Sequence, residues 1–143
     1  MSIKFIILGC GSSMGVPRAD GFFGNCDPKN KKNYRTRCSA VIKFHNQNIL
    51  IDTSPDLRHQ LLSNKIKSIN KVFYTHLHAD HITAIGKLRE QTKCKSIMGE
   101  QTKAECVSER LGDGEYLKVG DLNLKALYTP GHTDDSYSFL LDD

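Results

Sequence analysis

The feature that most constrains this chain is a cluster of metal-ligand side chains within six consecutive residues. The cluster reads His-Leu-His-Ala-Asp-His, and its ligand-type residues are His76, His78, Asp80 and His81. It follows an apolar run at residues 72–74, which is typical of a buried strand. Packing gives no reason for three neighbouring histidines at a strand end, whereas a metal ion requires neutral imidazoles and a carboxylate presented from one rigid turn. We therefore predict a metal site at this turn.

The spacing of the cluster predicts two adjacent metal positions. His76 and His78 are two residues apart, so their side chains point to the same side of an extended backbone. The turn that follows can direct Asp80 and His81 toward a neighbouring point. We expect the second position to be weak, because two protein ligands rarely hold zinc alone.

Two motifs of the chain resemble those of one superfamily. HLHADH is similar to the HxHxDH signature of the metallo-β-lactamase superfamily of hydrolases and related oxidoreductases, and PGHT at residues 130–133 resembles a later loop of that superfamily. The resemblance implies that His76, His78 and His132 hold one metal, while Asp80 and His81 help to hold a second. It also implies one or two zinc ions as cofactor and an α+β fold, the αββα sandwich of this superfamily.

A zinc ion with three histidine ligands keeps one open position, where bound water has a pKa near 7 and becomes a nucleophile. We predict a metal-dependent hydrolase in which this water attacks an ester, phosphodiester or lactam-type bond, while Asp80 orients or deprotonates it. Two alternatives remain open. One is oxygen chemistry at a single iron held by His76, His132 and a carboxylate, as the resemblance to persulfide dioxygenases implies. The other is a non-catalytic protein whose exposed sheet edges are completed by a partner chain.

A carboxylate, Asp52, ends another apolar strand. The resemblance implies that it accepts a hydrogen bond from a ligand histidine, which fixes the tautomer of that ring and raises its basicity. The alternative is that Asp52 caps the helix predicted at residues 56–63, although residues 54–56 already supply a good cap there.

The two halves of the chain resemble different relatives. Residues 1–81, with LGCGSSMGVPR, GNCDPKNKKNYRTRCS and LIDTSPDLR, look like phosphoribosyl cyclic phosphate phosphodiesterases. Residues 75–143, with TPGHTDDSYSFLL, look like persulfide dioxygenases and glyoxalase II proteins. We predict a gene fusion with its seam near residues 75–84, which would give one partial domain over residues 1–143.

The resemblance also implies that the sandwich is truncated or incomplete at its C-terminal side. Intact members supply a Gly-Asp carboxylate and a last histidine after the PGHT loop, and neither follows His132 here. At 143 residues the chain is short for the superfamily, so we expect one half of the sandwich and the start of the other.

A basic stretch lies in an irregular loop predicted over residues 18–37. Its candidate substrate-binding residues are Lys31, Lys32, Arg35 and Arg37. They could attract a small phosphate-bearing substrate, although a solvated loop is the simpler interpretation and the PGHT side suggests a thiol-linked substrate instead. A net charge of +4 is too mild to indicate nucleic-acid binding.

Composition places the chain among ordinary globular proteins, with 38% hydrophobic and 25% charged residues. No apolar run reaches the length of a membrane span, and the apolar N-terminus is better explained as a first strand than as a signal peptide. Five cysteines without a CxxC pair predict reduced thiols and a cytoplasmic protein, in which Cys10, Cys26 and Cys38 are small buried hydrophobes. A homodimer is compatible with this composition.

Apolar periodicity predicts the regular elements. The expected strands are 3–8, 38–44, 49–51, 71–75, 96–98, 122–128 and 137–141, and the expected helices are 56–63, 82–91 and 101–110. The glycine-rich loop at residues 9–17 is expected to approach the rim of the metal site.

Overall fold

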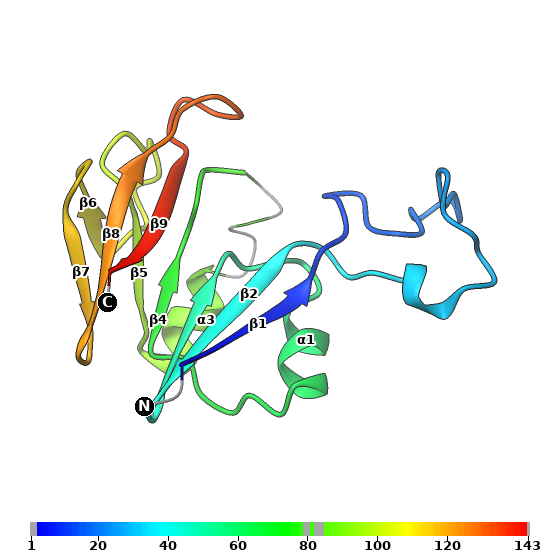
Figure 1. Ribbon diagram of the computed structural model, residues 1–143, viewed down its shortest axis with the longest axis horizontal. Coiled ribbons are helices and arrows are strands. Elements are labelled where there is room, and N and C mark those ends of the chain that lie inside the picture. Colours follow the sequence, from blue (N-terminus) through cyan, green and yellow to red (C-terminus); the bar gives the residue numbers. More distant parts are fainter. Residues whose placement is uncertain (1–2, 79–80, 82–84, 143) are drawn as a thin grey trace.

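The computed structural model describes residues 3–78, 81 and 85–142, which form two β-sheets packed face to face (Figure 1). The larger sheet has the strand order β1-β2-β3-β4-β5-β6, and the smaller sheet has the order β7-β8-β9. The large-sheet strands are β1 (Ile3–Gly9), β2 (Ser39–Phe44), β3 (Gln47–Ile51), β4 (Lys71–Phe73), β5 (Lys95–Gly99) and β6 (Glu109–Leu111). The small-sheet strands are β7 (Tyr116–Val119), β8 (Leu122–Tyr128) and β9 (Tyr137–Asp142), and the helices are α1 (Leu57–Ser63), α3 (Ile85–Thr92) and the 3-10 turn η1 (Lys31–Asn33).

The large sheet separates two apolar cores. One face packs against the helices, with Leu50 and Val72 meeting Leu57 of α1 and Leu88 of α3. The opposite face packs against the small sheet through residues that alternate with these along the strands, including Ile49, Phe73, Ile97, Leu124 and Ala126. The described residues therefore form three layers, helix, sheet and sheet, which confirms the predicted sandwich incomplete at its C-terminal side.

Strand direction places the site residues at one edge of the large sheet. β1, β2 and β3 are antiparallel, whereas β3, β4, β5 and β6 run parallel. Because the carboxyl ends of parallel strands meet at the same edge, Asp52 after β3 and the histidine loop after β4 lie side by side.

The small sheet covers the part of the large sheet nearest β4 and β5. The rings of Phe73 and Phe139 lie 4.8 Å apart, which places β9 over β4. A Cβ atom on Gly99 of β5 would lie only 2.1 Å from the Tyr137 ring, so only glycine permits this close approach. This packing brings the loop between β8 and β9 next to the loop that follows β4.

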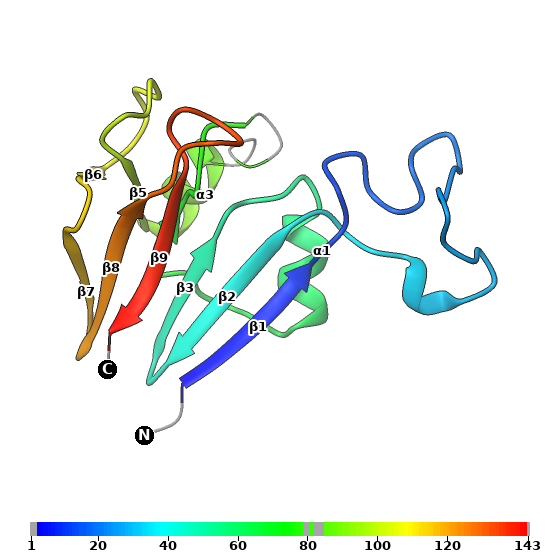
Figure 2. The same cartoon turned by 45° about the horizontal axis from the view of Figure 1, so that its top comes forward.

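A long segment between β1 and β2 projects away from both sheets in both views, and we call residues 10–38 the arm (Figures 1 and 2). Its root is closed by backbone hydrogen bonds from Gly11 N to Thr36 O and from Arg35 N to Val16 O, each 2.8 Å. A Cβ atom on Gly9 would lie 2.1 Å from the Arg37 carbonyl oxygen. The close approach that these glycines permit is therefore to the returning segment of the arm, instead of to the predicted rim of the metal site.

The helix predicted at residues 101–110 is wrong. These residues form a turn and then β6, which pairs parallel with β5. The Arg110 guanidinium donates hydrogen bonds to the carbonyl oxygens of Thr102 and Ala104, and the Thr102 hydroxyl accepts one from the Ala104 amide. Side chains thus satisfy backbone groups that a helix would have paired internally.

The remaining strand and helix predictions hold with small shifts. β7 was not expected, and α3 spans Ile85–Thr92 where a helix over 82–91 was predicted, with residues 82–84 outside the described part of the chain. The prediction of three buried thiols is wrong, since Cys10 and Cys38 are exposed, Cys26 is half-buried, and none of the five described cysteines forms a disulfide. In the described part of the chain, the helices fall short of the length and apolarity that a bilayer span requires.

Candidate metal centre

The candidate centre is built from three segments that two sheets bring together. After β4, the amide of Tyr74 still bonds to the Ile97 carbonyl oxygen at 3.0 Å, and the chain then turns out of the sheet. The side chains at the centre are Asp52 after β3, His76, His78 and His81 after β4, and His132 in the loop between β8 and β9.

Three imidazoles converge in a geometry that fits a metal ion. One ligand nitrogen from each of His76, His78 and His132 lies within 4.8 Å of the other two. His76 Nε2 and His78 Nδ1 are 3.2 Å apart. A tetrahedral zinc ion with Zn–N bonds of about 2.0 to 2.1 Å holds its nitrogen ligands about 3.3 Å apart, so this pair is already at the required separation.

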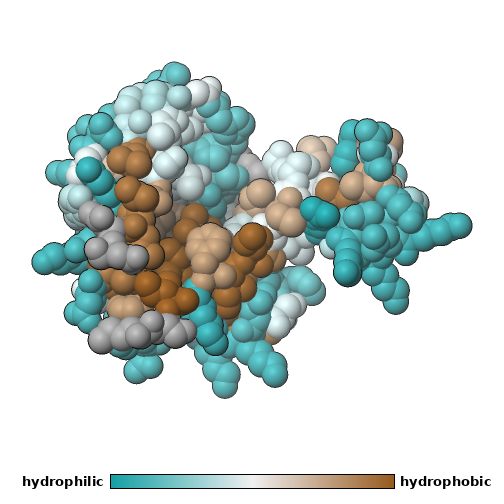
Figure 3. Space-filling view, in the orientation of Figure 1, coloured by the Kyte–Doolittle hydropathy of each residue, from teal (hydrophilic) through white to brown (hydrophobic). Residues whose placement is uncertain are grey.

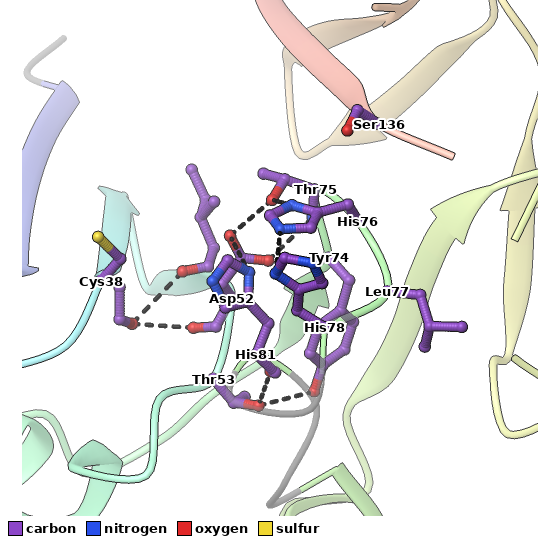
Figure 4. Close-up of polar contacts among 12 residues, drawn as sticks. Cys38, Asp52, Thr53, Tyr74, Thr75, His76, Leu77, His78, His81 and Ser136 are labelled. Atoms are coloured by element: carbon purple, nitrogen blue, oxygen red, sulfur yellow. Dashed lines mark hydrogen bonds and ion pairs between the residues drawn. The ribbon is translucent and has the colours of Figure 1, made fainter. Parts of the chain in front are cut away.

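Thr75 determines which nitrogen of His76 is available. Its hydroxyl donates to Asp52 Oδ2 at 2.8 Å, because a carboxylate can only accept (Figure 4). The same hydroxyl oxygen lies 2.8 Å from His76 Nδ1 and, having used its single hydrogen, must accept there. His76 therefore carries its hydrogen on Nδ1 and directs the lone pair of Nε2 toward His78.

Asp52 is buried, with 6% of its surface exposed, and its carboxylate is fully engaged. Oδ1 accepts the Thr75 amide at 2.9 Å, and Oδ2 lies 3.4 Å from His81 Nδ1. The Asp52 backbone has a φ of 55°, a left-handed conformation that turns the carboxylate out of β3 toward the histidines. Asp52 thus reaches His76 through Thr75 and approaches His81 directly, and it takes no part in starting α1.

His81 is positioned beside the group of three. Its amide bonds to the His78 carbonyl oxygen at 3.0 Å, and its own carbonyl accepts from both the amide and the hydroxyl of Thr53. Its ring centroid lies 4.4 Å from that of His76 and 6.0 Å from that of His78. Asp80 lies outside the described residues, so the second metal position stays a prediction.

Burial and neighbouring charge keep His76 in its neutral form. Burial lowers the pKa of His76 below its ordinary value, the neighbouring His81 lowers it further, and Asp52 acts in the opposite direction without outweighing them. A neutral imidazole is the form that binds a metal, so the site is prepared for one at neutral pH.

The arm carries the four basic side chains that are predicted to bind substrate, and they lie in three different places. Lys31 and Lys32 lie in η1, on the part of the arm that projects away from the sheets (Figure 2). Arg37 is committed to the arm root, where it binds Asp56 at 2.9 Å. Arg35 Nη1 lies 3.7 Å from Cys10 Sγ. Their role in substrate binding stays a prediction, since the structure does not bring η1 to the histidines.

Sequence reasoning missed two residues that organise the centre. Thr75 links Asp52 to His76, and Asp135 accepts the amide of Leu77 at 3.1 Å. The available signals were slight: Thr75 directly precedes the first histidine, and Asp135 follows His132 by three residues.

The fold and the site together define a class, a two-sheet protein with a candidate metal centre at the carboxyl ends of its strands. The model of the metallo-beta-lactamase superfamily matches residues 38–143. The chain therefore belongs to the metallo-β-lactamase superfamily, as the HLHADH and PGHT motifs predicted.

Curated relatives match part of the chain. A hydroxyacylglutathione hydrolase of Nitrobacter hamburgensis is 40% identical over 78 residues, which are 53% of this chain and 31% of that protein. An octanoyltransferase of Porphyromonas gingivalis is 35% identical over 114 residues, covering 76% of this chain and 23% of the relative. The chain thus spans about a quarter to a third of the length of these relatives.

Two solved structures match nearly the whole chain. A diphosphatase from the PhnP family has a TM-score of 0.78 and 26% identity, covering 99% of this chain and 62% of that chain. ETHE1 from Myxococcus xanthus has a TM-score of 0.66 and 30% identity, covering 99% and 54%. Each single structure extends over both halves of this chain, while the proposed gene fusion stays a prediction.

Proposed function

We propose that this chain carries the metal centre of a metal-dependent hydrolase, in which His76, His78 and His132 hold a zinc ion. The observation that carries this proposal is the convergence of their three ligand nitrogens within 4.8 Å. The orientation of His76 by Thr75 and Asp52 supports it, because a ligand histidine generally donates a hydrogen bond from its other ring N–H to a fixed acceptor.

The protein's own groups perform distinct parts of the reaction. When bound, the ion supplies Lewis-acid activation of water, lowering its pKa to about 7. Thr75 and Asp52 hold the His76 ring in one tautomer, and the shielded setting of that ring keeps it unprotonated. We propose that Asp80 orients or deprotonates the attacking water and that His81 contributes to a second, weaker position.

The donor set favours zinc over iron. Within the described residues, the group that could hold a metal consists of three imidazoles, and Asp80 lies outside those residues. Three nitrogen donors suit zinc, whereas the iron sites of oxygenases use two histidines and a carboxylate. Hydrolysis is therefore the function proposed first, and oxygen chemistry at iron, which the sequence resemblance to persulfide dioxygenases implies, is the alternative.

The substrate class follows from the relatives. The names of two of them, hydroxyacylglutathione hydrolase and diphosphatase, describe hydrolysis at a carbonyl or a phosphorus centre. We propose a small electrophilic substrate of one of these two kinds, either thiol-linked or phosphate-bearing, which an activated water can attack.

Metal analysis tests this proposal. Wild-type protein loaded with zinc and freed of excess ion should retain about one tightly held ion per chain, because three histidines suffice for a zinc site with an open position. His76→Ala should lose it, whereas His59→Ala should retain it, since His59 is exposed on α1 and its ring lies 3.4 Å from Ser63 Oγ on the same helix. Unchanged zinc in His76→Ala would contradict the proposed centre.

A second measurement separates hydrolysis from oxygen chemistry. The zinc-loaded protein should cleave a thioester or phosphate ester without consuming oxygen, and His132→Ala should abolish the cleavage. Oxygen uptake with a persulfide thiol and iron would support the alternative instead.

We also propose that the chain associates with a second copy of itself through an exposed apolar face. The supporting observation is an exposed apolar face on β1, where Phe5 is 60% and Ile7 65% exposed (Figure 3). These residues pair in register with Ile42 and Ala40, so they continue the face that packs against the small sheet.

A further inference from the structure

The two loops that carry the histidines come from different sheets; sheet packing brings them together, and hydrogen bonds between described residues of the two segments then fix their separation. One contact is the hydrogen bond from the Tyr137 amide to the Thr75 carbonyl oxygen at 2.9 Å. The other runs from the Leu77 amide to Asp135 Oδ2 at 3.1 Å. Leu77 lies between His76 and His78, so this second contact falls at the centre of the ligand-bearing turn.

We propose that Asp135 is a positioning residue for the metal centre. Its carboxylate holds the loop of His132 against the turn of His76 and His78. It thereby sets the distance between the ligand nitrogen of His132 and those of the other two histidines. The proposal rests on the proposed function, because it assigns a role within the same centre.

Both oxygens of the Asp135 carboxylate accept hydrogen bonds, and the two donors lie on different loops. Oδ1 accepts the Thr133 hydroxyl at 2.8 Å, which fixes the residue next to His132. Oδ2 accepts the Leu77 amide on the other loop. One side chain therefore clamps the position of His132 to that of the two other histidines.

The loop around Asp135 is rigid enough to transmit this constraint. The Thr133 amide donates to Ser136 Oγ at 3.2 Å, and the Gly131 amide donates to the Thr133 carbonyl oxygen at 3.2 Å. These bonds enclose His132 on both sides, so a displacement of Asp135 is expected to move His132 with it. A ligand on an exposed side chain gains most from such preorganisation, and His132 is exposed.

The neighbouring acid provides a matched control. Asp134 carries the same charge, is exposed, and its carboxylate makes no hydrogen bond within the described part of the chain. Asp134→Asn and Asp135→Asn therefore remove the same charge at nearly the same place. Asp135→Asn keeps one oxygen that can accept a hydrogen bond and replaces the other with an NH2 group that can only donate. Asp135→Ala loses both hydrogen bonds.

The experiment measures zinc affinity by competition with a chromophoric chelator in the full chain. Asp135→Ala should bind zinc about 10- to 100-fold more weakly than wild type, the range typical of residues that orient metal ligands, and Asp135→Asn should lie between the two. Asp134→Asn should match wild type. Equal losses in the two asparagine variants would overturn the proposal, because charge alone would then explain them, and wild-type affinity in Asp135→Ala would overturn it as well.

A second readout without metal separates this proposal from the proposed function. In the zinc-free protein, the Leu77 amide should exchange its hydrogen slowly in wild type and Asp134→Asn, and faster in Asp135→Ala. Protection of Leu77 that is lost only in the Asp135 variants, in a protein that binds no zinc, would reject the metal centre while retaining the contact. Equal exchange in all variants would reject the contact itself.

Discussion

At the scale of single residues, the hydroxyl of Thr75 decides the orientation of His76. Thr75→Val preserves the shape of the side chain but removes the hydrogen bonds to Asp52 and to His76 Nδ1. We expect zinc affinity to fall about 10- to 100-fold, because the His76 ring loses its fixed tautomer. Chelator competition measures the change.

The conservative variant distinguishes orientation from packing. Thr75→Ser retains the hydroxyl and should keep affinity near that of wild type. If Thr75→Val and Thr75→Ser bind zinc equally well, the relay through Thr75 has no role.

The His76 ring makes the metal-free protein sensitive to acid. In the unfolded chain the pKa of His76 is about 6.5, and in the folded protein burial and His81 lower it. The unfolded state therefore takes up a proton first as the pH falls. The free energy of unfolding contributed by this ring is fully present above a pH of about 6.5 and declines as the pH falls below that value, toward the lower pKa of the folded state.

Urea unfolding of chelator-treated protein between about pH 8 and pH 5.5 measures this dependence. The wild type should lose stability in the acid part of this range, and His76→Gln should lose less. Identical pH dependence in the two proteins would show that His76 does not titrate as described.

The ligand histidines could be predicted from the sequence, because closely spaced histidines beside an aspartate indicate metal binding directly. Thr75 and Asp135 could not, because their roles exist only through contacts with Asp52 and Leu77, which are 23 and 58 residues away along the chain. A threonine or an aspartate at a loop position carries no comparable signal of its own.

At the scale of elements, α1 is tied to the root of the arm by one buried glutamine. Gln60 is 1% exposed, accepts from Ser54 Oγ at 2.9 Å and donates to the Arg37 carbonyl oxygen at 2.8 Å. Gln60→Leu would leave these buried partners unsatisfied, so we expect the free energy of unfolding to fall by about 1 to 3 kcal/mol.

Chemical denaturation measures this change, with Gln91→Leu as the control. Gln91 is an exposed glutamine on α3, and its replacement should alter stability by less than about 0.5 kcal/mol. An equal effect at both positions would mean that the buried hydrogen bonds of Gln60 contribute little.

Elements with a clear period were predictable and short ones were not. β8 alternates apolar and polar residues from Leu122 to Ala126, and the sequence pattern detects this alternation. β6 has three residues and depends on pairing with β5, while Arg110 bonds to the carbonyl oxygens of the preceding turn. Tertiary contacts of this kind override local helix propensity, and they explain the wrong prediction at residues 101–110.

At the scale of the whole molecule, the six-stranded sheet is wider than the three-stranded sheet that covers it. Apolar side chains of β1 therefore remain exposed, including Ile3, Phe5 and Ile7, and the view in Figure 3 shows an apolar patch on this face of the molecule. The sandwich class and its incomplete side followed from the motifs, but the location of this exposed face required the packing.

Replacing two residues of this face tests whether it binds another polypeptide. Phe5→Lys combined with Ile7→Lys should reduce self-association, because lysine on an edge strand opposes pairing. Sedimentation velocity at several protein concentrations measures the change. Phe22→Lys, on the equally exposed Phe22 of the arm, should leave association unaltered. Equal effects of both changes would indicate general solubility instead of a specific face.

The central claim of this account is that imidazoles from two distant loops bind one ion. X-ray absorption at the zinc edge tests it most directly, since zinc–nitrogen bonds of about 2.0 to 2.1 Å are resolved from zinc–sulfur bonds of about 2.3 Å. The zinc-loaded protein should show about three histidine ligands, and His132→Ala should show one fewer. Sulfur ligands from the cysteines, or an unchanged histidine signal in His132→Ala, would contradict the claim.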